Sequence, residues 1–256
     1  MDDESSTKKE ITDHLVAALR EDKFILYAQM IAPLTSGDSE RPFQEILVRF
    51  REEEEKLLPP GSFFPILEEY HLIPYVDRWV VSLLAKRMAA ARTQQPDSPP
   101  PRNGVNLSGD TLRDENFAEF VHKRVERSQL PEGTFTFEFS WDIAILNAEP
   151  FMKLTAQLKP DGCSFTLAGF DGSNASFDAL KRFKPDFVKL DYSIAKDIGR
   201  ALAASERAES ITEKCHALGI KTIAEYVESP EALEQLQLVG VDYAQGLVIS
   251  PPEPLS

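Results

Sequence analysis

Charged and amide side chains recur in or directly beside short apolar runs of this chain, where β-strands are expected. The residues in these places are Glu45, Asn106, Glu138, Lys189, Glu225 and Gln245. Such groups are costly to bury unless a partner satisfies them, so any one of them alone would be interpreted as a structural ion pair. Their recurrence in or beside six separate runs predicts a functional site instead.

The chemical types of these side chains narrow the reactions that the site could support. Glu45, Asn106 and Glu138 carry hard oxygen ligands, which suit Mg²⁺ or Mn²⁺ better than zinc. None of the four histidines follows one of the apolar runs. Arg49 and Lys189 supply the positive charge that a phosphate-bearing ligand requires. The set therefore predicts metal-assisted phosphoester chemistry.

Composition limits the partners of the chain. Its 256 residues include 28 Lys and Arg against 42 Asp and Glu, a net charge of −14. This charge argues against DNA and anionic membrane surfaces as partners, although a small anionic ligand can still bind in a local pocket. Cys163 and Cys215 form neither a disulfide framework nor a zinc spacing. Because no membrane segment or signal peptide is recognisable, we expect a cytoplasmic protein.

Eight short apolar runs predict the strands that must position these side chains. They cover residues 24–28, 43–50, 104–107, 134–139, 164–167, 186–190, 220–224 and 241–244. Helical spacing of apolar residues occurs between several of them, at 79–91, 117–125, 205–218 and 230–238. Gly219 and Gly240 follow the last two patterns and are typical of helix C-termini.

This alternation predicts a parallel sheet with helices covering it. Eight strands in a chain of this length fit a closed TIM-like (β/α)8 barrel better than an open sheet, and no glycine-rich nucleotide loop follows a strand. We expect a single barrel domain over 22–256, preceded by an N-terminal helix and linker over 1–21. Loops are expected at 35–42 and 93–103, and the acidic run at 51–56 is expected to be solvated surface.

A series of short motifs occurs in order between residues 22 and 254. The motifs are Gln29; Glu45-Ile46-Leu47 with Arg49-Phe50; Pro60 and Phe63; Asp77-x-Trp79-Val80; Val105-Asn106-Leu107-Ser108; Glu138; Lys189-Leu190-Asp191; Ala224-Glu225-x-Val227-Glu228; and Gln245-Gly246 before Pro251. Each motif is weak alone, but the ordered set resembles the EAL domain, the bacterial barrel that hydrolyses the second messenger cyclic di-GMP.

The resemblance implies a mechanism for active members. Two divalent metal ions hold a bridging water that attacks one phosphodiester and releases the linear dinucleotide. The metal ligands correspond to Glu45, Asn106 and Glu138 here, together with two adjacent aspartates after the fifth strand. Lys189 and Glu225 complete the catalytic site.

The chain departs from the family after the fifth strand. Where the family has Asp-Asp-Phe-Gly-Thr-Gly, this chain has Ala168-Gly169-Phe170-Asp171-Gly172-Ser173. Two neighbouring metal ions need bridging anionic ligands, and Asp171 is offset by three residues. Trp141, Tyr226 and Met30 also replace a glutamate, a glycine and a proline of the family. We therefore expect no bound metal and no catalysis, with Glu45, Asn106 and Glu138 as vestigial metal ligands and Lys189 and Glu225 as vestigial catalytic residues.

The groups that the resemblance assigns to ligand binding are largely retained. They are Gln29, Glu45, Leu47, Arg49, Asp77, Asn106, Glu138, Asp191, Glu225, Glu228 and Gln245. The favoured interpretation is a catalytically inactive receptor for cyclic di-GMP in bacterial signalling. Loss of two aspartates also reduces the repulsion that an anionic ligand meets.

Two other functions remain open. A ligand-free protein-interaction module would keep only the fold, but retention of Arg49, Asp77 and Gln245 argues against it. A residual phosphodiesterase would need Mg²⁺ or Mn²⁺, and the Ala168-Gly169 pair argues against that. Besides cyclic di-GMP, the expected partners are another protein or upstream signalling domains, and a second copy of the chain in a homodimer.

Overall fold

The computed structural model of the chain describes residues 2–21, 23–35, 41–51, 57, 58, 61, 63–198 and 200–255. Most of the expected loop at 35–42, residues 52–56 of the acidic run, and Pro60 lie outside the described residues.

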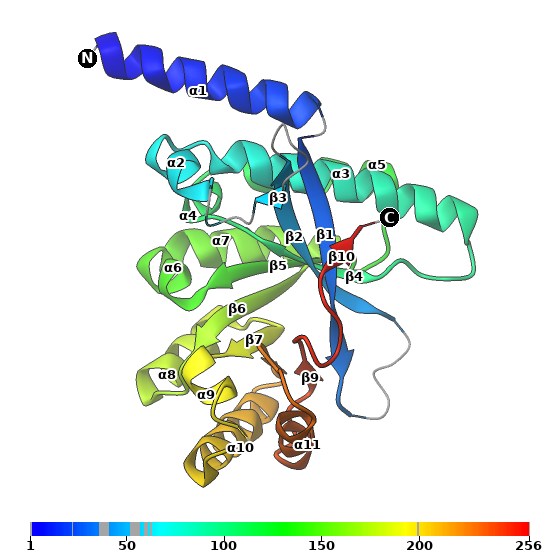
Figure 1. The fold of residues 1–256 in the computed structure, drawn as a ribbon, viewed down its shortest axis with the longest axis vertical. Coiled ribbons are helices and arrows are strands. Elements are labelled where there is room, and N and C mark those ends of the chain that lie inside the picture. The colour runs from blue at the N-terminus through cyan, green and yellow to red at the C-terminus, as the bar shows by residue number, and fades with distance from the viewer. Residues whose placement is uncertain are drawn as a thin grey trace.

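The eight predicted strands are present and close into a barrel (Figure 1). Their bounds are β1 Phe24–Pro33, β2 Phe43–Arg51, β4 Arg102–Asn106, β5 Phe135–Ser140, β6 Ser164–Phe170, β7 Phe187–Leu190, β8 Lys221–Ala224 and β9 Tyr243–Ala244. The sheet order β1-β9-β8-β7-β6-β5-β4-β2 returns to β1 through the β1–β2 pairing. Two short strands, β3 (Leu57–Leu58) and β10 (Glu253–Pro254), pair with β2 and β1. The TIM-like barrel prediction is confirmed.

The direction of β1 differs from the expected all-parallel sheet. β1 runs antiparallel to both β2 and β9, whereas the other barrel strands pair in parallel. The chain between β1 and β2 is too short for a crossover helix, and a short connection joins only antiparallel strands. The reversal brings the middle of β1, and not its C-terminal end, beside the site, where Gln29 pairs in register with Glu45.

Helices surround the barrel strands (Figure 1). They are α1 Asp2–Arg20, α2 Phe64–Glu69, α3 Ile73–Gln94, α4 Gly109–Leu112, α5 Phe117–Ser128, α6 Trp141–Leu146, α7 Ala148–Leu158, α8 Asn174–Phe183, α9 Tyr192–Ala195, α10 Leu202–Ala217 and α11 Pro230–Leu238, with a 3-10 turn at Lys159–Asp161. The predicted helices correspond to α1, α3, α5, α10 and α11. Gly219 and Gly240 follow α10 and α11 with φ of +72° and +76°, which confirms them as C-terminal glycines.

The strands bury side chains on both faces. On the outer face, Phe137 of β5 packs edge-on against Phe117 of α5, and Phe139 packs against Phe151 of α7. A separate apolar cluster consists of Ile31, Phe43, Phe187, Ile223 and Tyr243. The rings of Phe43 and Phe187 are 5.3 Å apart although β2 and β7 are not neighbours in the sheet. This contact therefore crosses the inside of the barrel, and we call the cluster the lower layer.

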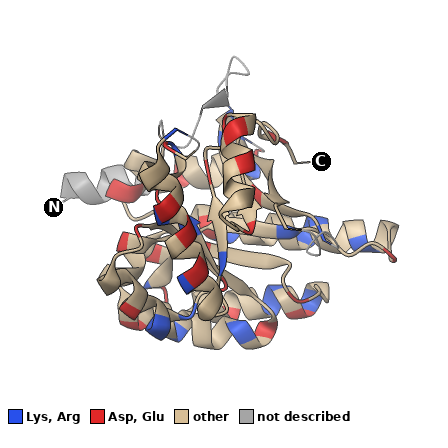
Figure 2. Cartoon of the chain, turned by 90° about the horizontal axis from the view of Figure 1, so that it is seen from below, with Lys and Arg blue, Asp and Glu red and all other residues tan. Residues whose placement is uncertain are grey.

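The surface helices carry both signs of charge. In the view of Figure 2, Asp and Glu are interspersed with Lys and Arg over the outer helices, and no broad face is exclusively basic. Among the described residues, no helix combines the length and the apolar character needed to cross a membrane.

Candidate functional site

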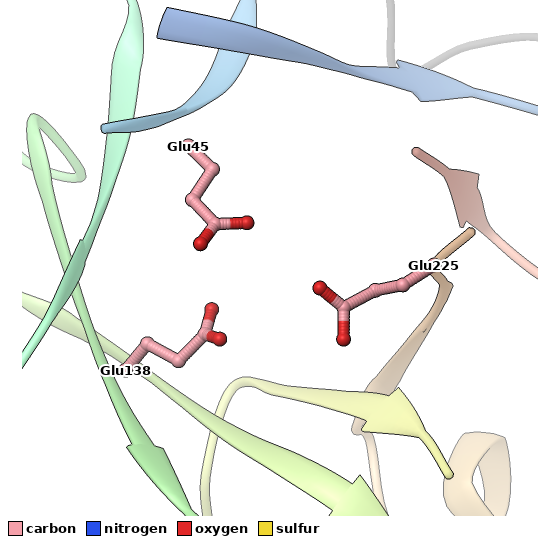
Figure 3. A group of neighbouring side chains, drawn as sticks. All are labelled: Glu45, Glu138 and Glu225. Carbon is pink, nitrogen blue, oxygen red and sulfur yellow. The ribbon is translucent and has the colours of Figure 1, made fainter. Parts of the chain in front are cut away.

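A lysine inside the barrel lies among three glutamates. The Lys189 ammonium nitrogen is 2.8 Å from Glu45 Oε2, 2.8 Å from Glu138 Oε2 and 3.0 Å from Glu225 Oε1. Lys189 has 0% of its surface exposed, and Glu45 and Glu138 are also buried. Figure 3 shows the three carboxylates converging from different strands. The residues that the sequence placed at separate strand ends therefore form one charged cluster.

Strand geometry explains why these residues meet. Side chains at alternate positions of a strand point to the same face. Each of four strands carries a lower-layer residue, and a polar residue of the site comes two positions later. The pairs are Phe43 and Glu45, Phe187 and Lys189, Ile223 and Glu225, and Tyr243 and Gln245, and the last two polar residues directly follow the ends of β8 and β9. The polar residues therefore lie above the apolar layer, towards the C-terminal ends of these strands.

Amide side chains hold Glu45 in place. Asn106 Nδ2 donates to Glu45 Oε1 at 2.7 Å, and Gln245 Nε2 donates to Glu45 Oε2 at 2.8 Å. Gln245 Nε2 also lies 3.1 Å from Gln29 Oε1, and Gln29 donates to the carbonyl of Ser250. The Oε1 atom of Gln245 is buried and has no hydrogen-bond partner among the described residues. One acceptor at the site is thus available to a ligand or a water.

The segment after β8 lies tightly against Gln245. Val227 N donates to the Gln245 carbonyl at 3.0 Å, and a Cβ atom on Gly246 would collide with the backbone of Val227. Gly246 therefore permits the close approach that positions Gln245 beside the glutamates.

Burial and charge shift the titration of the cluster in opposite directions. Burial lowers the pKa of Lys189, but the charges of Glu138, Glu45 and Glu225 outweigh it and hold that pKa well above its usual value. Burial raises the pKa of Glu45, and the charge and hydrogen bond of Lys189 reverse this to a net lowering. Burial raises the pKa of Glu138 to about 8, against the charge of Lys189 and with the help of the other two glutamates. Glu138 is therefore more readily protonated than Glu45, and a proton on it would reduce the negative charge of the site.

The end of β6 lacks the carboxylates that two metal ions would need. Ala168 pairs in register with Lys189, and the strand is irregular between Ala168 and Phe170. Gly169 between them has a φ of +79°. The Asp171 carboxylate accepts hydrogen bonds from Ser173 N at 3.0 Å and from the Ser176 hydroxyl at 2.6 Å, so it is engaged at the start of α8.

The other carboxylates of the site do not make up for the metal ligands that are missing at the end of β6. Carboxylate oxygens of Glu45, Glu138 and Glu225 lie within 4.8 Å of one another, close enough to hold a single cation. The ammonium group of Lys189, however, already bonds to all three. The residues present therefore do not fit a centre of two bridged metal ions.

A cavity of roughly 340 Å³ opens above the cluster and gathers most of the predicted ligand-binding residues. Predicted residues that line this central cavity are Gln29, Glu45, Leu47, Arg49, Glu225, Glu228 and Gln245. The Arg49 guanidinium lies 5.6 Å from the centre of the Tyr27 ring and donates to the carbonyl of Val48. No carboxylate is within ion-pair distance of Arg49 among the described residues, so its charge is available to an anion in the cavity.

Asp77 lies in a second cavity, next to the first. This cavity measures roughly 350 Å³, has mainly apolar walls from α2, α3, β2 and β4, and shares Leu47 with the central cavity. The buried Asp77 Oδ2 accepts hydrogen bonds from Ser108 N and Oγ, both at 3.1 Å, and from Thr111 Oγ1 at 2.6 Å. Burial raises the pKa of Asp77 to about 6. We call this space the Asp77 cavity; Asn106 also lines it.

Asp191 is separated from the other predicted residues. Its side chain accepts a hydrogen bond from Ser193 N at 2.9 Å and caps α9, and it does not line either cavity in the described structure. Trp141 also packs away from the site, against the rings of Phe170 and Phe183.

Sequence reasoning did not assign Tyr226 to the site, but Tyr226 lines the central cavity beside Glu225. The available signal was its position directly after a predicted site residue.

Comparison with known proteins gives a consistent result. The family model of the EAL domain matches residues 12–252. A relative named cyclic di-GMP phosphodiesterase PdeB, from Shewanella oneidensis, is 32% identical over 244 residues, covering 94% of this chain and 28% of that protein. Cyclic di-GMP phosphodiesterase PdeF of Escherichia coli is 29% identical over 255 residues, covering 98% of this chain and 33% of that protein. The chain thus spans about a third or less of these relatives.

Solved structures share the fold. The FimX EAL domain of Xanthomonas citri, in complex with c-diGMP, superposes with a TM-score of 0.88 at 24% identity and covers 100% of this chain and 98% of that one. The FimX EAL domain of Pseudomonas aeruginosa, bound to c-di-GMP, gives 0.85 at 26% identity, with coverage of 93% and 94%. The barrel described above is therefore the barrel of these domains.

Proposed function

Because this chain belongs to the EAL domain family, we propose that it is a receptor that binds cyclic di-GMP without hydrolysing it. The observation that carries the proposal is the end of β6, where a methyl group at Ala168 lies beside Lys189. The family resemblance places a metal-bridging carboxylate there. Without that carboxylate, the attacking water loses the two-metal arrangement that would activate it.

The charge distribution supports binding of an anion despite three neighbouring glutamates. Lys189 neutralises part of their charge, and the raised pKa of Glu138 makes this carboxylate easier to protonate than a free one. Arg49 lines the central cavity and can contact a phosphate through two N–H groups. The central cavity therefore offers a positive group to a phosphate, and the negative charge of the glutamates that line or underlie it is partly neutralised.

The Asp77 cavity supports recognition of a guanine base. Its walls are mainly apolar, as a planar base requires, and they include the buried carboxylate of Asp77 and the exposed Glu68. The hydrogen bonds of Asp77 to Ser108 and Thr111 all use Oδ2. Oδ1 is therefore the atom that would accept from the N–H groups of guanine, a pattern of donors that adenine lacks. Leu47, shared by both cavities, would lie between the base and the phosphate.

Calorimetric titration with cyclic di-GMP, in EDTA and in Mg²⁺, tests binding, and chromatography of the nucleotide after incubation with Mg²⁺ or Mn²⁺ tests hydrolysis. We expect equal affinity in both buffers and hydrolysis at least about a thousandfold below that of an active family member, because loss of the bridging ligand removes several kcal/mol of transition-state stabilisation. Metal-dependent turnover to the linear dinucleotide that is abolished by Glu45→Ala would contradict the receptor function. Absence of binding at high micromolar ligand would favour the ligand-free module.

The second candidate is a phosphodiesterase with residual activity, favoured by the convergence of three glutamates within 4.8 Å. The double variant Ala168→Asp with Gly169→Asp separates the two functions. It should raise Mg²⁺ affinity, measured by calorimetry, because it restores the missing carboxylates. Asp tolerates the left-handed backbone of Gly169 better than most residues do. Equal Mg²⁺ affinity in the wild type would show that its own glutamates already bind the metal.

A protein partner, upstream signalling domains and a homodimer remain predictions from the resemblance. Sedimentation of the purified chain with and without cyclic di-GMP would test the homodimer directly.

A further inference from the structure

Tyr226 adopts a backbone conformation that tyrosine rarely takes. It follows Glu225 with a φ of +57°, in the left-handed region that favours glycine. Burial of the ring does not offset the free energy of this strained backbone conformation, because 59% of the surface of Tyr226 is exposed. Strain of this kind is concentrated at functional sites, where the side chain is needed in a particular place.

A second exposed ring supports Tyr226 from the side. The rings of Tyr192 and Tyr226 meet edge-to-face, with centres 5.2 Å apart and planes at 84°, and Tyr192 is 56% exposed. Lys196 lies 5.6 Å from the centre of the Tyr192 ring. The edge-to-face contact orients Tyr226 and leaves much of its surface open to solvent.

Tyr226 lies on the boundary between two hollows. It lines the central cavity together with Gln29, Glu45 and Arg49. It also lines a smaller pocket of roughly 90 Å³, whose wall includes the basic residues Lys196 and Arg200. A ligand whose phosphates lie in the central cavity can therefore also contact the ring of Tyr226.

The location of Tyr226 relative to the Asp77 cavity suggests what it contacts. Cyclic di-GMP has two guanine bases, and the Asp77 cavity, beside β2 and β4, would take one of them. The sheet order β4-β2-β1-β9-β8 puts the end of β8, where Tyr226 follows, on another side of the barrel mouth. The central cavity joins the two places through Leu47 and Tyr226. The second base therefore extends towards Tyr226.

We propose that Tyr226, supported by Tyr192, is a stacking surface for the second guanine base of the ligand. The inference rests on the proposed binding of cyclic di-GMP and adds a residue that the family motif does not contain, since the family has glycine at this position. Stacking of a base on an aromatic side chain contributes enough to be measured by substitution.

Calorimetric titration of cyclic di-GMP into a set of variants tests the proposal. Tyr226→Ala should weaken binding by about tenfold or more, the effect of losing one stacked base. Tyr226→Phe keeps the ring and should bind nearly as tightly as the wild type. Tyr75→Ala is the matched control, because Tyr75 of α3 is similarly exposed, at 48%, and lines neither cavity.

Tyr226→Gly distinguishes stacking from an effect of the backbone. Glycine accepts the positive φ without strain, so the melting temperature of Tyr226→Gly should be no lower than that of Tyr226→Ala. Both variants should nevertheless lose affinity equally. Recovery of wild-type affinity in Tyr226→Gly, or unchanged affinity in Tyr226→Ala, would overturn the stacking surface alone. Failure of the wild type to bind would overturn the receptor function and this inference together.

Discussion

Five strands of the barrel contribute to two layers of its interior that differ in chemistry. The lower layer contains Ile31, Phe43, Phe187, Ile223 and Tyr243. Two positions away along the chain, on the strands or directly after them, an upper layer contains Gln29, Glu45, Lys189, Glu225 and Gln245. The two layers share strands, and most of their residues are buried, yet one is held by packing of rings and the other by charge and hydrogen bonds.

The two layers differ in how much they contribute to the stability of the fold. Apolar burial in the lower layer stabilises the fold directly. A buried ion cluster contributes little net stability, because removing its charges from water costs about as much as their attraction returns. Stability alone therefore does not account for the upper layer, whose members depend on one another as partners. Substitutions in the two layers should have different consequences.

The largest effect on stability is expected for Lys189→Met. This change leaves the buried Glu45 and the half-buried Glu225 beside each other without a cation, and breaking such a cluster costs about 3–5 kcal/mol of the free energy of unfolding. Phe187→Leu, two positions earlier on β7, keeps an apolar side chain and should cost under about 1.5 kcal/mol. Urea unfolding at pH 7.5 measures both. Equal stability of the two variants would mean that the upper layer does not depend on its lysine.

The next effect concerns pH. The folded pKa of Glu138 is raised to about 8 from an unfolded value of 4.5, so the folded state binds the extra proton. The resulting stabilisation is fully present below pH 4.5 and is lost as pH rises to about 8, at up to ~1.4 kcal/mol per pH unit. Between pH 6 and pH 8, urea unfolding in EDTA should therefore show a fall of roughly 2 kcal/mol in the wild type.

Glu138→Gln is the matched variant for this window, because glutamine is uncharged throughout. Its free energy of unfolding should fall less between pH 6 and pH 8 than that of the wild type. The raised pKa of Lys189 does not affect stability between pH 6 and pH 8, because its contribution to stability is lost only at a pH above the usual pKa of lysine. Parallel pH profiles for the wild type and Glu138→Gln would show that Glu138 is already ionised at pH 6.

Arg49→Ala tests the function of the upper layer without breaking it. Loss of a charge-assisted phosphate contact should cost about 1.5–3 kcal/mol of binding free energy, or ten- to a hundredfold in affinity for cyclic di-GMP. Arg49→Lys should be intermediate, because lysine keeps the charge and loses the two-point geometry. Changes in the acidic run at 52–55 should matter far less. Unchanged affinity in Arg49→Ala would assign Arg49 to a structural contact with Tyr27.

The smallest effect is expected for Ile223→Val in the lower layer. Removing one methylene from a fully buried site should cost about 0.5–1.5 kcal/mol of stability. Affinity for cyclic di-GMP should stay unchanged, because the residue lies below the charged cluster. Calorimetry and urea unfolding on the same preparation check both statements. A change in affinity would show that the two layers are coupled.

The fold was largely predictable because its signals are local. A run of β-prone residues bounded by polar residues marks each strand, so the eight strands were located from the sequence. Helices α2, α4, α6, α7, α8 and α9 were not predicted. The antiparallel direction of β1 was also missed, although the short connection to β2 indicated it.

The site residues Glu45, Lys189 and Glu225 were found because a charged residue in or directly after an apolar run is a local anomaly. Asp191 had the same signal, but the structure uses its carboxylate to cap α9. Both outcomes satisfy a buried or partly buried carboxylate, so the sequence could not distinguish them. Asp77, expected among the ligand contacts, proved to lie in a neighbouring cavity, which only the packing of α3 against β4 reveals.

Residue order alone predicts the barrel, the alternation of apolar and polar residues along its strands, and a strand end at Ala168-Gly169 without carboxylates. Each of these depends on residue type and short spacing, which are the same in any conformation. Only the tertiary structure decided that Lys189 bonds to three glutamates and that Tyr226 meets Tyr192 beside the cavity. Those contacts join strands and loops that are distant in the chain, and barrel closure brings them together.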